Sequence, residues 1–469
     1  MRERFSRRVG NLTAALLCSI ANVATAQAIP AQLSAAQAQQ DLDVARKSLE
    51  EAHGALYRFT PKPELDRKFD TIRARANRAM SRREFFGLVN ELLAATGDGH
   101  ARVDQDDSTT AELDRALRFP LNVVLEGTRL MVTANAARDD SRIKPGMEIT
   151  SINGHRRPAW RASCRPSGVT DSSKRGGAPP SAVRSRFATG STSTRRPGLR
   201  SRLAHHGVNT LGRPAFGTPA HQNSVPRLAT IAEPPRTSAA LCRRLAVALL
   251  KIRAFVGTAF RVTDSAVTLA IDRRTGDDPR PRGNGGGTDM FGAKLVSHFT
   301  DKPFRYSTTS IATIAPSFAT WLPRTFASTK AGTTPHPGGG YRVTRELHEG
   351  VAEQPPAARP FLGKLVVLID GGTFSTSADV TAVLRSMNRA TFIGEETGGA
   401  YEGNTSGLNA SVILPNSRFK VFVQMYGYVN AVRPGPKGRG TLPDIEIART
   451  TEETLRGVDG VTADQPRAR

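Results

Sequence analysis

The sequence predicts a mixed α/β protein, and three patterns carry that prediction. Leu365 to Ile369 is a continuous apolar run rich in β-branched residues, as in a central strand buried on both faces, and two glycines follow it. From Asp379 onward, apolar residues recur at helical spacing. Upstream, residues 36–95 carry three apolar stripes of the kind that amphipathic helices bury. A helical region therefore precedes a segment in which strand and helix meet near residue 375.

The first 28 residues have the pattern of a secretory signal peptide. Four arginines among the first eight residues precede the short apolar stretch Leu12–Val23, and small residues suited to cleavage follow it. Cys18 lies in this stretch, but Leu17 before it is not the small residue that a lipoprotein cleavage site requires. No other segment reaches the roughly 18 apolar residues that span a bilayer. We therefore expect a soluble protein, periplasmic or secreted, without a lipid anchor.

Residues 36–103 are predicted to form an N-terminal helical domain. Ser81 and Glu84 have the spacing of a capping box, directly ahead of the third apolar stripe. The stripes are interpreted as core rather than as ligand-binding positions. Of the nine histidines, only His100 stands in a glycine-rich turn directly after such a helix. A lone loop histidine is more often a solvated surface residue, so this position alone does not identify a catalytic group.

Residues 117–155 are predicted to contain a hairpin and a fragment of a small binding module. Leu121–Leu125 and Leu130–Thr133 flank Gly127 as the two strands of a hairpin would. Ile143–Gly154 resembles the central strand and turn of a PDZ domain, which receives peptide C-termini by strand addition. A plain strand with an Asn-Gly turn explains the same residues equally well.

Residues 156–250 differ in character from the rest of the chain. They hold 17 Arg and Lys against only Asp171 and Glu233, which supplies +15 of the formal net charge of +24. No sustained strand or helix period runs through them. Two interpretations are open: a basic disordered insertion, or a shifted reading frame, which we favour because the break interrupts a recognisable domain. Since neither interleaved aromatics nor a binding motif accompanies the charge, we expect no nucleic-acid partner.

Ser375 is the candidate nucleophile because of its place between strand and helix. The N-terminal amides of a helix favour developing negative charge, and the N–H of Thr376 could point at an oxyanion. A serine hydroxyl also needs a neighbouring base, for which a histidine is suited. The alternative is that Ser375, Thr376 and Ser377 simply cap the helix.

Three motifs together resemble the tail-specific, or C-terminal processing, serine proteases, in the branch of the tricorn core protease and interphotoreceptor retinoid-binding protein. The motifs are Gly97-Asp98-Gly99-His100, Gly283-Asn284-Gly285-Gly286-Gly287, and Thr373–Asp379 followed by Arg389–Gly399. The resemblance implies a crotonase-like (ClpP-like) α/β catalytic core over residues 251–450, with residues 451–469 as a tail. It further implies Ser375 as nucleophile, His100 as base, and amides of Gly286 and Thr376 as the oxyanion hole. No metal or cofactor is implied.

The third member of the triad departs from the family pattern. The lysine that many bacterial relatives use is replaced by Ala400, and a basic run, Lys437–Arg439, occupies the place of the tricorn-like glutamate. Either another carboxylate orients His100, with Glu396, Glu402 and Asp444 as candidates, or the relay is incomplete.

The function predicted from the sequence is an exported serine endopeptidase that acts on peptides or proteins through an acyl-enzyme. A non-catalytic peptide- or lipid-binding protein on the same scaffold is the alternative, and a product that never folds is a third. Only Cys164 and Cys242 remain after leader removal, so at most one intramolecular disulfide is possible and neither has zinc-ligand spacing.

Overall fold

The computed structural model describes residues 32–105, 109–110, 121–126, 129–136, 142–152, 155–156, 201–205, 208–209, 237–242, 247–252, 254–256, 283–312, 331–337, 340–435 and 437–456. The predicted signal peptide lies outside these residues. Within them, no helix is both long enough and apolar enough to cross a membrane.

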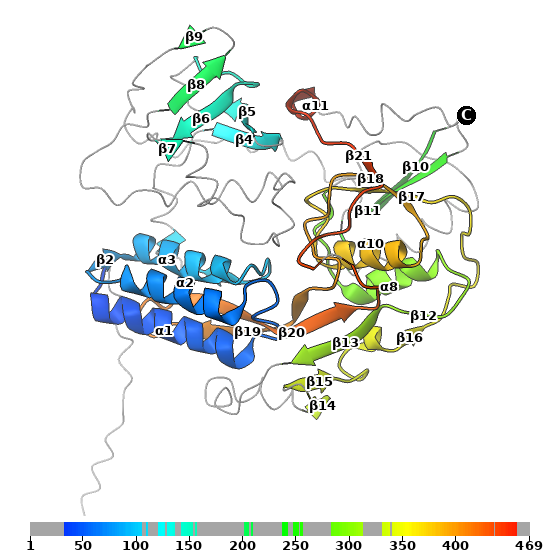
Figure 1. Ribbon diagram of the computed structural model, residues 1–469, viewed down its shortest axis with the longest axis horizontal. Coiled ribbons are helices and arrows are strands. Elements are labelled where there is room, and N and C mark those ends of the chain that lie inside the picture. Colours follow the sequence, from blue (N-terminus) through cyan, green and yellow to red (C-terminus); the bar gives the residue numbers. More distant parts are fainter. Residues whose placement is uncertain are drawn as a thin grey trace, which may run out of the picture.

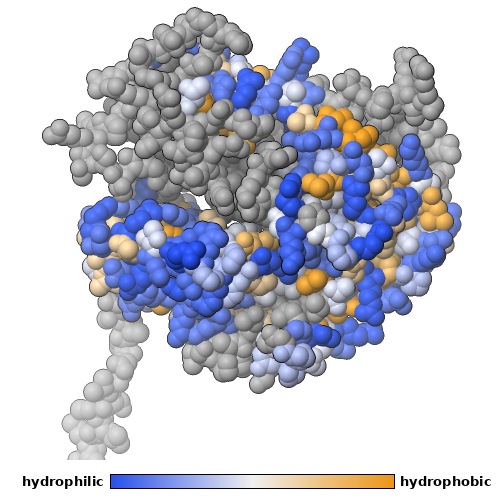
Figure 2. All heavy atoms as spheres, in the orientation of Figure 1, coloured by the Kyte–Doolittle hydropathy of each residue, from blue (hydrophilic) through white to orange (hydrophobic). Residues whose placement is uncertain are grey.

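The three predicted helices form as α1 (Ala35–Ala52), α2 (Lys62–Ala74) and α3 (Arg82–Ala95). A full capping box occurs at α1, where Ser34 and Gln37 satisfy each other's backbone N–H groups. At α3 only half of the predicted box forms. Ser81 accepts from the Glu84 N–H, while the Glu84 carboxylate pairs with Arg78. Hydrophilic side chains cover much of the outward face of these helices (Figure 2).

The helices pack on a long antiparallel pair of strands from the other end of the chain. Strands β19 (Thr405–Ile413) and β20 (Lys420–Asn430) run beneath them (Figure 1). One buried cluster joins the helices to these strands, and Phe419 stacks on Phe85 within it. The other strands of this sheet are β3 (Arg102–Asp104), β13 (Ser307–Ala312), β14 (Thr333–Pro335) and β15 (Tyr341–Val343).

Asp41 on α1 fastens the helices to the turn between β19 and β20. Its fully buried carboxylate accepts the Asn416 N–H at 3.0 Å and the Ser417 N–H at 2.7 Å. Because these donors lie about 375 residues away along the chain, the N-terminal helices share a core with the C-terminal strands and do not close a separate one.

A second core surrounds a parallel sheet of β17 (Val366–Ile369), β18 (Thr391–Gly394) and β21 (Ile445–Glu446). Helices α8 (Asp289–Ser297) and α10 (Thr376–Ser386) pack together beside it (Figure 1). Smaller elements here are β12 (Phe304–Arg305), β16 (Glu353–Gln354) and the 3-10 turn η4 (Glu349–Val351).

The exposure of strand β17 contradicts one prediction from the sequence. It was expected to be central and buried on both faces, yet Val366 is 38% exposed, and among the described residues β17 pairs with β18 alone. Only Ile369 at its end is fully buried. A run of β-branched residues reports preference for the extended backbone, and burial depends on which neighbours cover each face.

The predicted hairpin forms as β4 (Leu121–Glu126) and β5 (Arg129–Asn135). The strand of the PDZ-like fragment forms as β6 (Glu148–Ile152), which pairs with β5, β7 (His155–Arg156) and β8 (Ser201–His205). Strand β9 (Val208–Asn209) pairs with β8, whereas β10 (Thr237–Cys242) and β11 (Val247–Ile252) pair with each other in a separate two-stranded sheet. Thus parts of the basic segment are paired strands, and its remainder lies outside the described residues.

The remaining described elements lie near the two ends of the chain. A two-residue strand, β1 (Gln32–Leu33), pairs with β2 (Met80–Ser81) just before α3. The predicted tail begins as α11 (Thr451–Arg456), where Thr451 bonds the Glu126 carboxylate of β4.

Candidate active site

Ser375 lies immediately before α10, in a backbone conformation that residues other than glycine rarely adopt. Its φ is 54° and its ψ is −133°. Such geometry is strained for a residue other than glycine and is often found at functional sites. The Ser375 side chain makes no capping hydrogen bond, so the capping interpretation is wrong for this residue. Helix α10 begins at Thr376, three residues before the first residue of the predicted helix.

His100 contacts Ser375 across the two cores. Its Nε2 lies 3.1 Å from the Ser375 Oγ, although the residues are 275 positions apart. The imidazole packs on the Phe374 ring with centroids 4.7 Å apart, and the His100 carbonyl accepts from the Gln424 side chain on β20. The predicted base and nucleophile are therefore brought within hydrogen-bond reach.

The glycine loop lies directly against the turn that carries Ser375. The Phe374 N–H donates to the Asn284 carbonyl at 3.1 Å, and the Thr376 hydroxyl donates to the Gly287 carbonyl at 2.7 Å. A Cβ at Gly286 would lie 2.7 Å from the Ser375 Cβ. Only a residue without a side chain allows this approach, which explains the glycine.

The two predicted oxyanion donors differ in their present bonding. The Gly286 N–H donates to its neighbour's side chain, Asn284 Oδ1, at 2.9 Å. The Thr376 N–H has no acceptor within the described part of the chain, and neither has the N–H of Gly287. Gly287 was not predicted as a donor, and the order of glycines in the motif could not distinguish it from Gly286.

A buried carboxylate, Asp98, faces His100 from the same turn. Asp98 Oδ1 accepts the His100 backbone N–H at 2.8 Å and lies 3.5 Å from His100 Nδ1. Its Oδ2 accepts from His53 Nε2 at 2.8 Å and from the Thr405 hydroxyl. Burial alone would raise the pKa of Asp98, but hydrogen bonds from His100 and His53 outweigh it and hold that pKa well below its usual range.

Two of the three carboxylates proposed from the sequence as the triad acid are bonded to other groups. Glu396 forms two bonds with Arg439 and accepts the Gly440 N–H. Asp444 pairs with Arg385 and accepts the Phe392 N–H. Among the described residues, neither of them nor Glu402 hydrogen-bonds to His100.

A second buried carboxylate, Asp379, lies on the first turn of α10. Asn404 donates to its Oδ2 at 2.5 Å and Asn430 donates to its Oδ1 at 3.0 Å. Burial raises the pKa of Asp379 to about 7, and the nearby Asp289 adds to this, while Asn430, His100 and Arg58 lower it. Asp379 therefore carries a fractional charge near neutral pH, one turn from the candidate nucleophile.

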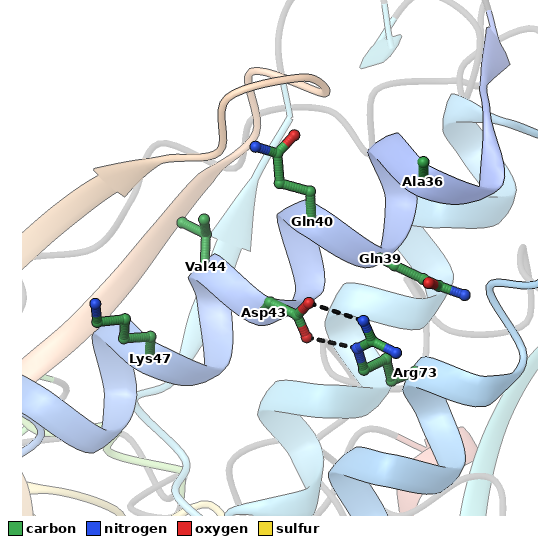
Figure 3. Close-up of a pocket in the computed structure, with 7 residues that line it drawn as sticks. All are labelled: Ala36, Gln39, Gln40, Asp43, Val44, Lys47 and Arg73. Atoms are coloured by element: carbon green, nitrogen blue, oxygen red, sulfur yellow. Dashed lines mark hydrogen bonds and ion pairs between the residues drawn. The ribbon is translucent and has the colours of Figure 1, made fainter.

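In the parts of the chain that the structure describes, no group of three or more His, Cys, Asp or Glu side chains could hold a metal ion. A groove runs along α1 and reaches α2, and Asp43 of α1 forms a two-bond ion pair there with Arg73 of α2 (Figure 3). None of its lining residues belongs to the Ser375 site.

Comparison with known proteins defines the class. Residues 281–447 match the family model of Peptidase family S41. No curated protein matches the chain. The matched residues include Ser375 and the glycine loop, so the part of the chain that carries the candidate nucleophile is similar to a family of tail-specific, serine-type peptidases.

The fold of the chain is similar to that of several solved structures. The chain is similar to mature CPAF, with 16% identity, a TM-score of 0.56, and coverage of 90% of this chain and 94% of that one. The s499a mutant of CPAF matches at 12% identity with the same TM-score and coverage. Mature CPAF complexed with lactacystin matches at 14% identity and a TM-score of 0.56, covering 90% of this chain and 95% of that one. At these identities the likeness concerns the fold.

Proposed function

We propose that this protein is an exported endopeptidase that cleaves peptide bonds through an acyl-enzyme on Ser375, with His100 as the base. The contact between the Ser375 Oγ and the His100 Nε2, 3.1 Å long, carries the proposal. An imidazole within hydrogen-bond reach of a serine hydroxyl on a strained turn is the arrangement that activates a serine at neutral pH.

The reaction follows from this geometry. As the Ser375 Oγ attacks the scissile carbonyl, His100 takes its proton through Nε2 and later gives it to the leaving amine. Water then attacks the acyl-enzyme with His100 again as base, which releases the acid and restores the hydroxyl. The developing oxyanion is stabilised by the Thr376 N–H and by an amide of the glycine loop, each donor contributing about 3 kcal/mol.

The loop amide is supplied by Gly287 or by Gly286. Gly287 has no acceptor among the described residues, whereas Gly286 would first have to give up its bond to Asn284. In this proposal α8, α10 and the parallel strands form a crotonase-like core, and the β4–β6 region is a remnant of a PDZ-like module.

The proposed place of action is the periplasm or the exterior of the cell. Support comes from the basic and then apolar pattern of the first 28 residues. N-terminal sequencing of the protein recovered outside the cytoplasm tests this. A start at Met1 would contradict export by a cleaved leader.

A fluorophosphonate probe tests the enzymatic proposal, with Ser375→Ala beside the unaltered protein and a thermal melt of each. We expect labelling that requires Ser375, together with hydrolysis that the variant loses. Cooperative melting without labelling would favour a non-catalytic peptide- or lipid-binding protein instead, the alternative that the missing lysine and glutamate of the family suggest.

A further inference from the structure

The inference concerns Asp98, which is buried between two histidines. Its side chain is 3% exposed and the His53 side chain 1% exposed, whereas the His100 ring is 21% exposed and open to Ser375. One carboxylate thus joins an enclosed imidazole to the candidate base.

Both carboxylate oxygens of Asp98 accept hydrogen bonds. Oδ1 receives the His100 N–H and faces His100 Nδ1, while Oδ2 receives His53 and Thr405. A carboxylate in a dry site persists as an anion when charge-assisted hydrogen bonds replace its water. Asp98 can therefore stay deprotonated, because each group bonded to its oxygens is a hydrogen-bond donor.

The tautomer of His53 follows from its other nitrogen. The Ala55 N–H donates to His53 Nδ1 at 3.2 Å, so Nδ1 accepts and the proton of a neutral ring lies on Nε2, facing Asp98. His53 can therefore act as a fixed donor without carrying charge.

We propose that Asp98 is the positioning residue that orients His100 and stabilises its protonated ring, and that His53 holds Asp98 in place. This proposal rests on the function proposed above. Asp98 would accept a hydrogen bond from the His100 Nδ1–H and so leave Nε2 free to receive the proton of Ser375. The acid and the base of the triad would then both come from the turn that holds Asp98 and His100, and no carboxylate from the C-terminal segment would be required.

Other charged groups near His100 do not replace Asp98. Asp379 on α10 acts on His100 through space, and both its oxygens are bonded to amides. Arg58, between α1 and α2, is directed at the carbonyls of Asn404 and Tyr428. Asp98 is the carboxylate in the described residues that meets His100 Nδ1.

The test compares Asp98→Asn with Glu396→Gln, Glu402→Gln and Asp444→Asn, which remove the other candidate acids at equal size. We expect kcat of Asp98→Asn to fall at least about 100-fold with KM nearly unchanged, since the same change in a serine-protease triad costs about 10⁴-fold. The other three variants should retain kcat within a few fold. A loss of kcat in one of them equal to that of Asp98→Asn would overturn the proposal.

A second readout does not depend on turnover. The carboxylate that faces Nδ1 should hold the neutral His100 ring in the tautomer with its proton on Nδ1. The ring nitrogen resonances of His100, measured by NMR, report which nitrogen carries the proton, and Asp98→Asn should lose the preference for Nδ1. Unchanged ring resonances in a folded Asp98→Asn protein would refute the pairing. Absence of hydrolysis by the unaltered protein would refute the proposed function alone.

His53 is tested with a pair of variants. His53→Phe keeps a ring but removes the donor, and His53→Gln keeps a donor. We expect a roughly tenfold lower kcat in His53→Phe and partial recovery in His53→Gln, with the ring resonances of His100 changed only in the former. Equal kcat and equal resonances in both variants would remove His53 from the proposal.

Discussion

Replacement of Gly286 by alanine should disable the site through geometry alone. Gly286 has a φ of 97°, and a Cβ there would lie 2.7 Å from the Ser375 Cβ, 2.8 Å from the Phe374 carbonyl oxygen and 2.9 Å from the Thr376 nitrogen. A positive φ costs an L-residue about 1–2 kcal/mol. Overpacking of a fixed backbone adds about 1–3 kcal/mol. The free energy of unfolding should therefore fall by about 2–5 kcal/mol.

The effect on activity follows from the same distances. Ordinary contact begins near 3.4 Å, so the turn must retreat by roughly 0.7 Å, away from a 3.1 Å bond to His100. Since a misplacement of about 1 Å costs about 100-fold in rate, we expect the fluorophosphonate labelling rate to drop by about 10- to 100-fold.

Two neighbouring glycines serve as matched controls. Gly285 has open space around its Cβ position and no positive φ, so Gly285→Ala should label and unfold as the unaltered protein does. Gly283 has a φ of 91° but equally open space, so Gly283→Ala should lose about 1–2 kcal/mol of stability and keep its labelling rate. Denaturant unfolding and labelling kinetics measure both quantities. Normal labelling of Gly286→Ala, or an equal loss in Gly285→Ala, would refute the reasoning.

Three further predictions concern strain, pH and the shared core. The free energy of unfolding of Ser375→Gly should be about 1 kcal/mol higher than that of Ser375→Ala, because glycine relieves the strain of a φ of 54°. Equal midpoints of the two variants in denaturant melts would contradict this. Burial raises the pKa of Asp379 from 3.8 to about 7, so the native state binds the extra proton and stability should decline by a few kcal/mol as pH rises from about 4 to 7. Asp379→Asn should abolish that slope in pH-dependent melts, and a persistent slope would assign it to another group. Asp41→Ala should cost about 2–4 kcal/mol because it leaves buried backbone donors unpaired, whereas Asp43→Ala, which breaks an exposed ion pair, should cost under about 1 kcal/mol; similar melts would contradict the shared core.

The sequence predicted those features that depend on local pattern or on motif order. Three amphipathic stripes predicted three helices, because period and capping act within a few residues. The order of the family motifs predicted that His100 and Ser375 meet, and they do so at 3.1 Å. The burial of β17 was predicted wrongly, since composition cannot show which face a distant element covers.

The partner of His100 was beyond such reasoning for a specific physical reason. Asp98 lies between two glycines and has the appearance of a turn residue. Its importance arises from donors 45 positions upstream and 307 positions downstream, His53 and Thr405, which only the folded chain brings together. The available signal was its spacing of two residues from the candidate base, which is also common in ordinary turns.

Strand β20 explains how groups from two cores can hold an ångström-scale geometry. Gln424 on this strand binds the His100 carbonyl, and the Gly54 N–H donates to the Gln424 carbonyl beside His53. Six residues further, Asn430 binds Asp379 on the helix that follows Ser375. At about 3.3 Å per residue, the two attachment points lie about 20 Å apart on one rigid strand. Because this strand positions both the candidate base and the candidate nucleophile, local opening of either core at β20 should separate the pair before the whole chain unfolds. Labelling should therefore be lost at lower denaturant than global structure.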